Sequence, residues 1–124
     1  MSQPDTIMID DVKYVREDSI KSNEKAECLD GMPYVIVRTS SAGVFAGHLK
    51  KKEGQNAVLL KVRRLWRWYG AASLSQLAME GTSRPSECKF PCEVDEIELD
   101  QVIEVAQTTQ VAKDSIASVP VWEA

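Results

Sequence analysis

This sequence contains no run of apolar residues that approaches the roughly 20 needed to cross a bilayer. Its start, Met1-Ser2-Gln3-Pro4-Asp5, is polar and does not resemble a secretory signal. The three cysteines, Cys28, Cys88 and Cys92, are odd in number and form no paired framework. These absences predict a soluble, intracellular protein that has reduced cysteines and no membrane partner.

Groupings of catalytic or metal-binding residues are also scarce. His48 is the single histidine, and no serine or cysteine near it in sequence is arranged as a nucleophile. Cys88 and Cys92 have the wrong spacing for a zinc knuckle and lack a second pair. No glycine-rich phosphate loop of the NTPase or dinucleotide type is present. We therefore expect no enzymatic activity, no metal and no cofactor.

The length of 124 residues suits one compact domain. A net charge of −4 argues against a nucleic-acid partner, which would favour a basic protein. The charges are nevertheless segregated, because residues 38–67 are strongly basic and residues 93–104 carry only acidic charges. The basic part could hold a small anionic ligand, or the two parts could join copies of the chain. Two solvated faces without a function are an equally simple interpretation.

The hydrophobic pattern predicts an α+β fold with an antiparallel β-sheet core and two or three short helices. Strands are expected at 34–39, at 44–49 and from residue 57 onward, and another over 96–105, where a helix template also fits. One helix is expected between a Ser73 cap and Gly81, and another between a Thr109 cap and Pro120. We assign 1–30 to an N-terminal strand and polar arm and 31–124 to the single α+β domain. The arm is interpreted as a solvated helix or as a segment that orders against another subunit.

The most informative segment is 63–69, which contains three arginines and three aromatic residues. Aromatic rings stack on nucleobases, and guanidinium groups pair with phosphate oxygens. In an extended segment, Arg64, Trp66 and Trp68 would share one face, and Arg63, Arg67 and Tyr69 would share the other with Leu65. The segment is therefore either a ligand-binding surface or a strand at the edge of the core.

Arg38 lies in an otherwise apolar strand, where an unpaired buried arginine would be costly. The adjacent Ser40 and Ser41 belong to a turn of small residues that could present hydroxyls and backbone N–H groups to an anion. Together with the arginines of 63–67 this turn could complete a phosphate site. The alternative is a salt bridge from Arg38 to the acidic strand, within one chain or between subunits.

Two segments carry a family resemblance. Residues 35–47, Val-Ile-Val-Arg-Thr-Ser-Ser-Ala-Gly-Val-Phe-Ala-Gly, and residues 63–78, Arg-Arg-Leu-Trp-Arg-Trp-Tyr-Gly-Ala-Ala-Ser-Leu-Ser-Gln-Leu-Ala, resemble small bacteriophage and prophage proteins. These are similar to the phage Thoeris anti-defence sponges, which sequester cyclic ADP-ribose isomers made by bacterial immune enzymes. The resemblance implies a non-enzymatic, homo-oligomeric protein (dimer to hexamer) of the host cytoplasm that holds a cyclic nucleotide without cleaving it.

The residues we assign to such a site come from the physical argument. Trp66, Trp68 or Tyr69 would stack on adenine, and Arg38, Arg63, Arg64 and Arg67 would hold phosphates, with Ser40 and Ser41 adding hydrogen bonds. One competing interpretation is a phage interaction or structural accessory protein that binds a host or phage protein through its Arg/Trp surface. Another is single-stranded nucleic-acid binding by the same rings.

Overall fold

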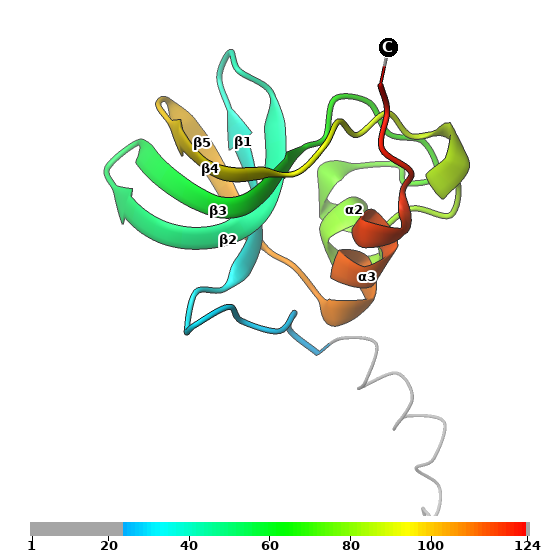
Figure 1. The fold of residues 1–124 in the computed structure, drawn as a ribbon, viewed down its shortest axis with the longest axis horizontal. Helices are drawn as coiled ribbons and strands as arrows, with labels where there is room; N and C mark the ends of the chain where they lie inside the picture. The colour runs from blue at the N-terminus through cyan, green and yellow to red at the C-terminus, as the bar shows by residue number, and fades with distance from the viewer. Residues whose placement is uncertain (1–23, 124) are drawn as a thin grey trace, which may run out of the picture.

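The computed structural model describes residues 24–123. Five strands form one antiparallel sheet in the order β4-β3-β2-β1-β5, and helices α2 and α3 pack on it (Figure 1). The α+β class and the antiparallel sheet expected from the sequence are confirmed. The elements are β1 (Tyr34–Thr39), β2 (Val44–Glu53), β3 (Asn56–Arg64), α2 (Leu74–Glu80), the 3₁₀ turn η1 (Pro85–Glu87), β4 (Val94–Leu99), β5 (Val102–Gln107) and α3 (Gln110–Ser118).

Strands β1 to β3 form a meander of two hairpins. β1 consists of β-branched and aromatic residues, and its first four side chains are all buried because both faces of this strand are covered. The turn to β2 is closed by Thr39, whose backbone N–H and side-chain hydroxyl both donate to the Gly43 carbonyl. Gly43 adopts a φ of 107°, which favours glycine. The strands and turn predicted over 34–49 are confirmed.

The sheet is curled, because its two edge strands, β4 and β5, are joined by only two residues, Asp100 and Gln101 (Figure 1). Gln101, at a φ of 58°, accepts a hydrogen bond at its carbonyl from the Ser40 N–H, and the Val102 N–H donates to the Gln55 carbonyl. The prediction of a single strand over 96–105 is therefore wrong in one respect, since a turn divides this segment into two strands, β4 and β5. The curled sheet encloses one apolar cluster: Val35, Val37, Phe45, Ala57, Leu59, Val62, Leu99 and Val102.

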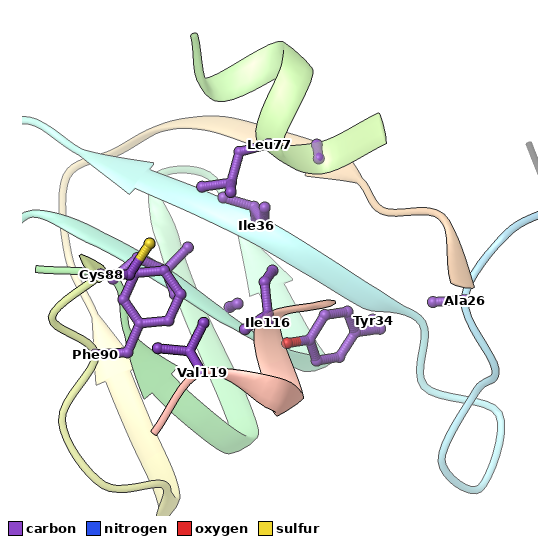
Figure 2. Packing of buried hydrophobic residues seen from close by; sticks show 11 residues of the cluster. Ala26, Tyr34, Ile36, Leu77, Cys88, Phe90, Ile116 and Val119 are labelled. Atoms are coloured by element: carbon purple, nitrogen blue, oxygen red, sulfur yellow. The ribbon is translucent and has the colours of Figure 1, made fainter. Parts of the chain in front are cut away.

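The opposite face of β1 and β2 packs against the two helices and the irregular segments around them (Figure 1). Figure 2 shows this second cluster, with Ile36 of β1 under Leu77 of α2, and Ile116 of α3 near Tyr34. Its buried members are Ala26, Tyr34, Ile36, Ala46, Leu65, Leu77, Ala78, Cys88, Phe90, Ile116 and Val119. Both helices therefore lie on one side of the sheet and bury a separate core there.

Both helix starts follow the capping chemistry read from the sequence. The Ser73 side chain accepts from the Gln76 N–H at 3.1 Å, and the Thr109 side chain accepts from the Ala112 N–H at 3.1 Å. α2 ends at Gly81, which has a φ of 78° and donates its N–H to the Leu77 carbonyl. The two predicted helices are confirmed.

Of the N-terminal part, only residues from Glu24 onward are described, so the predicted N-terminal strand and most of the polar arm lie outside the described residues. Residues 24–30 lie along the domain of the same chain. Ala26 is buried and donates its N–H to the Thr108 carbonyl, and Lys25 forms a bridge with Thr109. Within residues 24–123, no helix has the length and apolar character that crossing a bilayer requires.

Candidate functional site

Arg63 is buried at the end of β3, with 8% of its surface exposed. Its Nε, Nη1 and Nη2 atoms donate to five backbone carbonyl oxygens at 2.8–3.1 Å, those of Phe90, Pro91, Ile116, Val119 and Pro120. These carbonyls belong to the end of α3 and to the segment that precedes β4. Arg63 thus joins three segments of the fold, and each of its three side-chain nitrogens donates to the backbone of the chain itself.

The charge of Arg63 is held without a carboxylate partner among the described ion pairs. Burial lowers the pKa of its guanidinium from the ordinary value, while the nearby Tyr34 and Glu93 act in the opposite direction. A guanidinium stays protonated in proteins even so, and carbonyl dipoles supply its stabilisation. Arg63 is therefore a cation that organises the backbone, which differs from the phosphate-binding role that we expected.

Arg38, Ser40, Ser41 and Arg64 gather around the β1–β2 turn. Arg64 donates from Nη1 to the Ala42 carbonyl at 3.2 Å, and its guanidinium lies 4.6 Å above the centre of the Phe45 ring. The hydroxyls of Ser40 and Ser41 donate to Oε1 of Gln101 at 2.7 and 3.2 Å. These serines support the β4–β5 turn, which sequence reasoning did not anticipate.

Arg38 is exposed and lies 3.7 Å from Glu104 on the neighbouring β5. Lys50 of β2 pairs with Glu96 at 3.7 Å, and Lys61 of β3 pairs with Asp95 at 3.0 Å. Basic side chains of β2 and β3 therefore also form ion pairs with acidic side chains of β4. The basic and acidic segments of the sequence thus meet across strands within one chain. Exposed pairs of this kind contribute little stability, about 0–1 kcal/mol each.

Trp66 and Trp122 form the main exposed aromatic feature among the described residues. Their ring centroids are 4.8 Å apart and their planes are inclined by 9°, which is a parallel stack. Trp66 is 52% exposed and Trp122 is 42% exposed, so the pair lies on the surface. Two large rings at the surface of a small domain are a common mark of a binding site.

Two cations complete this feature. The Arg67 guanidinium lies 5.4 Å from the Trp66 ring centre, and the Lys89 amino group lies 5.9 Å from Trp66 and 5.6 Å from Trp122. We call the set Trp66, Arg67, Lys89 and Trp122 the indole platform. It offers aromatic faces and positive charge together, which suits a ligand with a flat ring and an anionic group.

Backbone pairing after β3 explains how distant segments build the indole platform. Arg67 and Lys89 form an antiparallel bridge, in which the Lys89 N–H donates to the Arg67 carbonyl at 2.8 Å. The next residue, Phe90, is buried and forms a parallel bridge with Val121, and the Trp122 N–H donates to the Phe90 carbonyl at 3.0 Å. Phe90 thereby places Lys89 and Trp122 beside the Trp66 segment.

The remaining aromatics of 63–69 are placed differently. Trp68 is half-buried and packs against the cluster under the helices. Tyr69 is partly exposed, its carbonyl accepts from the Thr82 hydroxyl, and its N–H donates to the Cys88 sulfur at 3.4 Å. Of the expected site residues, Trp66 and Arg67 lie together, and Trp68 lies apart from them in the core packing.

Two platform residues, Lys89 and Trp122, escaped the sequence-based assignment of the site. For Trp122, a third tryptophan near the end of a short domain was the available signal. Lys89 gave no local signal, because a single lysine in a loop is ordinary. Among residues 24–123, no group of three or more His, Cys, Asp or Glu side chains is close enough to hold a metal ion.

The chain belongs to a protein family described as a domain of unknown function (DUF6948), whose model matches residues 32–116. The matched range runs from the residue before Pro33 to Ile116 of α3, and so covers all five strands and both helices except the last residues of α3. No curated protein and no solved structure matches this chain.

Proposed function

We propose that this member of the family is a non-enzymatic binding protein that captures a small nucleotide-type ligand on the indole platform. The observation that carries this proposal is the exposed, parallel Trp66–Trp122 pair with two cations against its rings. In its specific form, the proposal is a phage-encoded sponge that sequesters a cyclic ADP-ribose isomer in the host cytoplasm. The sequence resemblance to the Thoeris anti-defence sponges supports that form.

Platform chemistry supports a ligand that combines a base with phosphate. A base stacked on an aromatic side chain gains about 1–3 kcal/mol. Charge-assisted hydrogen bonds from Arg67 and Lys89 would add about 1.5–3 kcal/mol each. One platform thus provides a gross gain of about 4–9 kcal/mol, before several kcal/mol are lost on association.

Capture with a nanomolar Kd requires a binding free energy of about −12 kcal/mol. A single platform falls short of that value, so the proposal includes a homo-oligomer in which two platforms, or a platform and a second surface, enclose one ligand. The polar patch around the β1–β2 turn, with Arg38 and Arg64, is a suitable second surface because its cations are exposed. Arg63 is left out of the proposed contacts, since it is buried and its three side-chain nitrogens already donate to carbonyls.

Calorimetric titration of the purified protein with cyclic ADP-ribose isomers tests the proposal. We expect binding that weakens about tenfold or more in Trp122→Ala and in Lys89→Gln. Lys52→Gln is the matched control, because Lys52 lies in β2 and makes no described contact with the platform. Heat denaturation of the complex should release the intact ligand. Absence of binding, or release of a cleaved product, would contradict the sponge.

A second candidate function is favoured by the apolar character of the same surface. Val121 is 49% exposed and adjoins Trp122, so the platform also has the composition of a protein-interaction anchor. In that case a partner protein captured from host lysate would be lost in Trp66→Ala and Trp122→Ala and retained in Lys52→Gln. Nucleotide titration would then show no binding.

A further inference from the structure

A cavity of about 250 Å³ lies beside Arg63, between the sheet and α3. β1, β2 and β3 contribute Tyr34, His48, Lys61 and Arg63, and α3 contributes Lys113, Ile116 and Ala117. Glu93, Val119 and Val121 complete its lining. No member of the indole platform lines this cavity, so it is a separate feature of the fold.

Tyr34 provides a hydrogen-bond donor that the described chain does not use. The residue is 9% exposed, and none of the hydrogen bonds described for residues 24–123 involves its hydroxyl. Figure 2 shows the Tyr34 ring beside Ile116, with its oxygen pointing toward α3. Its ring is fixed by an edge contact with His48 at 5.2 Å and by the Lys113 amino group at 5.3 Å. A buried hydroxyl normally finds a partner, so a missing partner indicates a place for one.

The charges around the cavity are mostly positive. Lys61, Arg63 and Lys113 stand against the single carboxylate of Glu93 in the lining. The Lys61 charge is offset by Asp95 at 3.0 Å, but no carboxylate lies in ion-pair contact with Arg63 or Lys113 in the described part of the chain. The excess of positive charge in the lining favours an anion nearby.

Lys113 is positioned to reach that anion. Its amino group makes one long hydrogen bond, 3.4 Å to the Glu27 carbonyl, and an ammonium group has three donors. His48 is different, because its Nδ1 lies 3.0 Å from the Met32 carbonyl, which accepts only. Nδ1 therefore carries a proton, and His48 is held in place by that bond. Among the lining groups, Tyr34 and Lys113 combine spare donors with the absence of a described carboxylate partner, whereas Lys61 is paired with Asp95.

We propose that this cavity binds a small organic anion, a carboxylate on a compact apolar body. The carboxylate would accept from the Tyr34 hydroxyl and the Lys113 ammonium group near the Arg63 charge. Its body would contact the apolar wall of Ile116, Val119 and Val121. A volume of about 250 Å³ corresponds to about eight water molecules of liquid volume, at about 30 Å³ each. No member of the indole platform lines the cavity, so this site is independent of the proposed function.

Benzoate is a suitable probe, and benzamide is its matched neutral control of the same shape. We expect benzoate to shift the backbone amide resonances of Lys113 and His48 saturably in an NMR titration, and benzamide to leave them nearly unchanged. No shift at about 10 mM benzoate, ten times a millimolar Kd, would overturn the proposal. So would equal shifts with benzamide, because they would show an apolar hole without anion selectivity.

Three variants locate the site. Lys113→Gln is expected to weaken benzoate binding about tenfold, and Tyr34→Phe, which removes only the hydroxyl, to weaken it about fivefold. Lys51→Gln makes the same charge change on an exposed β2 residue that does not line the cavity, and should bind as the parent does. Ligand-free spectra of each variant establish that it is folded. Equal losses in Lys51→Gln and Lys113→Gln would overturn the proposal, since they would show a general charge effect.

Discussion

The indole rings of Trp66 and Trp122 lie 4.8 Å apart and nearly parallel, although one follows β3 and the other follows α3. Because the stack is at the surface, its removal should affect binding more than folding. We expect Trp122→Ala to lower the free energy of unfolding by about 1 kcal/mol, the contribution of an aromatic pair. Guanidinium denaturation measures this change.

Trp68→Ala provides the comparison for that experiment. Trp68 is half-buried against the cluster under the helices, so its truncation leaves a cavity in the packing. We expect a loss of about 2–3 kcal/mol, clearly larger than for Trp122→Ala. The reverse order would show that the stack belongs to the core and does not form a free platform.

The carbonyl contacts of Arg63 predict a large effect of a conservative substitution. Arg63→Lys keeps the charge, but an ammonium group has three donors and cannot reach five carbonyl oxygens. Each buried carbonyl left without a partner costs about 1–3 kcal/mol, and we expect a total loss of about 3 kcal/mol or more.

Arg64→Lys is the matched control on the adjacent residue. Arg64 is exposed and makes one described hydrogen bond, so its replacement should cost less than about 1 kcal/mol. Denaturant midpoints of the two variants should differ widely. Similar midpoints would contradict the structural role assigned to Arg63.

Gly81 predicts a steric effect where α2 meets α3. Its φ of 78° is unfavourable for other residues, and an added Cβ would lie against Cβ and Oγ of Ser115 on α3. We expect Gly81→Ala to lower stability by about 3 kcal/mol through strain and overpacking together. Thermal unfolding followed by circular dichroism measures the loss.

Gly54→Ala separates the two causes. Gly54 also has a positive φ, 57°, but an added Cβ there meets nothing within 4 Å. Its cost should be that of the backbone alone, about 1 kcal/mol. If both variants lose the same stability, the contact between Gly81 and Ser115 is not tight.

Tyr34 predicts the behaviour of the protein at high pH. Burial raises the pKa of its phenol above the ordinary value near 10. Above about pH 10 the unfolded chain releases this proton and the folded chain retains it, so the unfolded state binds fewer protons and stability falls as pH rises. The contribution is fully present below that pH and is lost at a slope of up to about 1.4 kcal/mol per pH unit.

Urea unfolding of the parent and of Tyr34→Phe at about pH 9 and about pH 11 isolates this effect. The parent should lose more stability over that interval than the variant, which has no phenol to titrate at residue 34. Parallel losses in the two proteins would show that Tyr34 ionises as easily in the folded state as in the unfolded chain.

The secondary structure could be predicted from the sequence where local chemistry determines it. The Thr39–Gly43 turn, the Ser73 and Thr109 caps and the Gly81 end are set by residues within a few positions of one another. The division of 94–107 into two strands was missed, because Asp100 and Gln101 give a weak turn signal. Contacts of Gln101 with the Ser40–Ser41 turn hold it in place, and these contacts come from the tertiary fold.

The candidate site was only partly accessible from the sequence. Alternation correctly placed Arg63 with Leu65 on one face and Arg64 with Trp66 on the other, and in the structure the first pair is buried and the second is exposed. It failed beyond Trp66, where the chain leaves the sheet and Trp68 turns into the core packing. Lys89 and Trp122 could not be found, since only the Arg67–Lys89 and Phe90–Val121 bridges bring them to Trp66.

The pairing of β5 with β1 has a consequence for folding during synthesis of the chain. On one edge, residues Val35 to Thr39 of β1 pair only with β5, residues 102–107. On the other edge they pair with β2, a pairing that can form as soon as β2 emerges. During translation, one side of this apolar strand must therefore wait unpaired until most of the domain has left the ribosome. An open strand edge invites pairing with other chains, so nascent copies depend on rapid completion of this contact or on a chaperone.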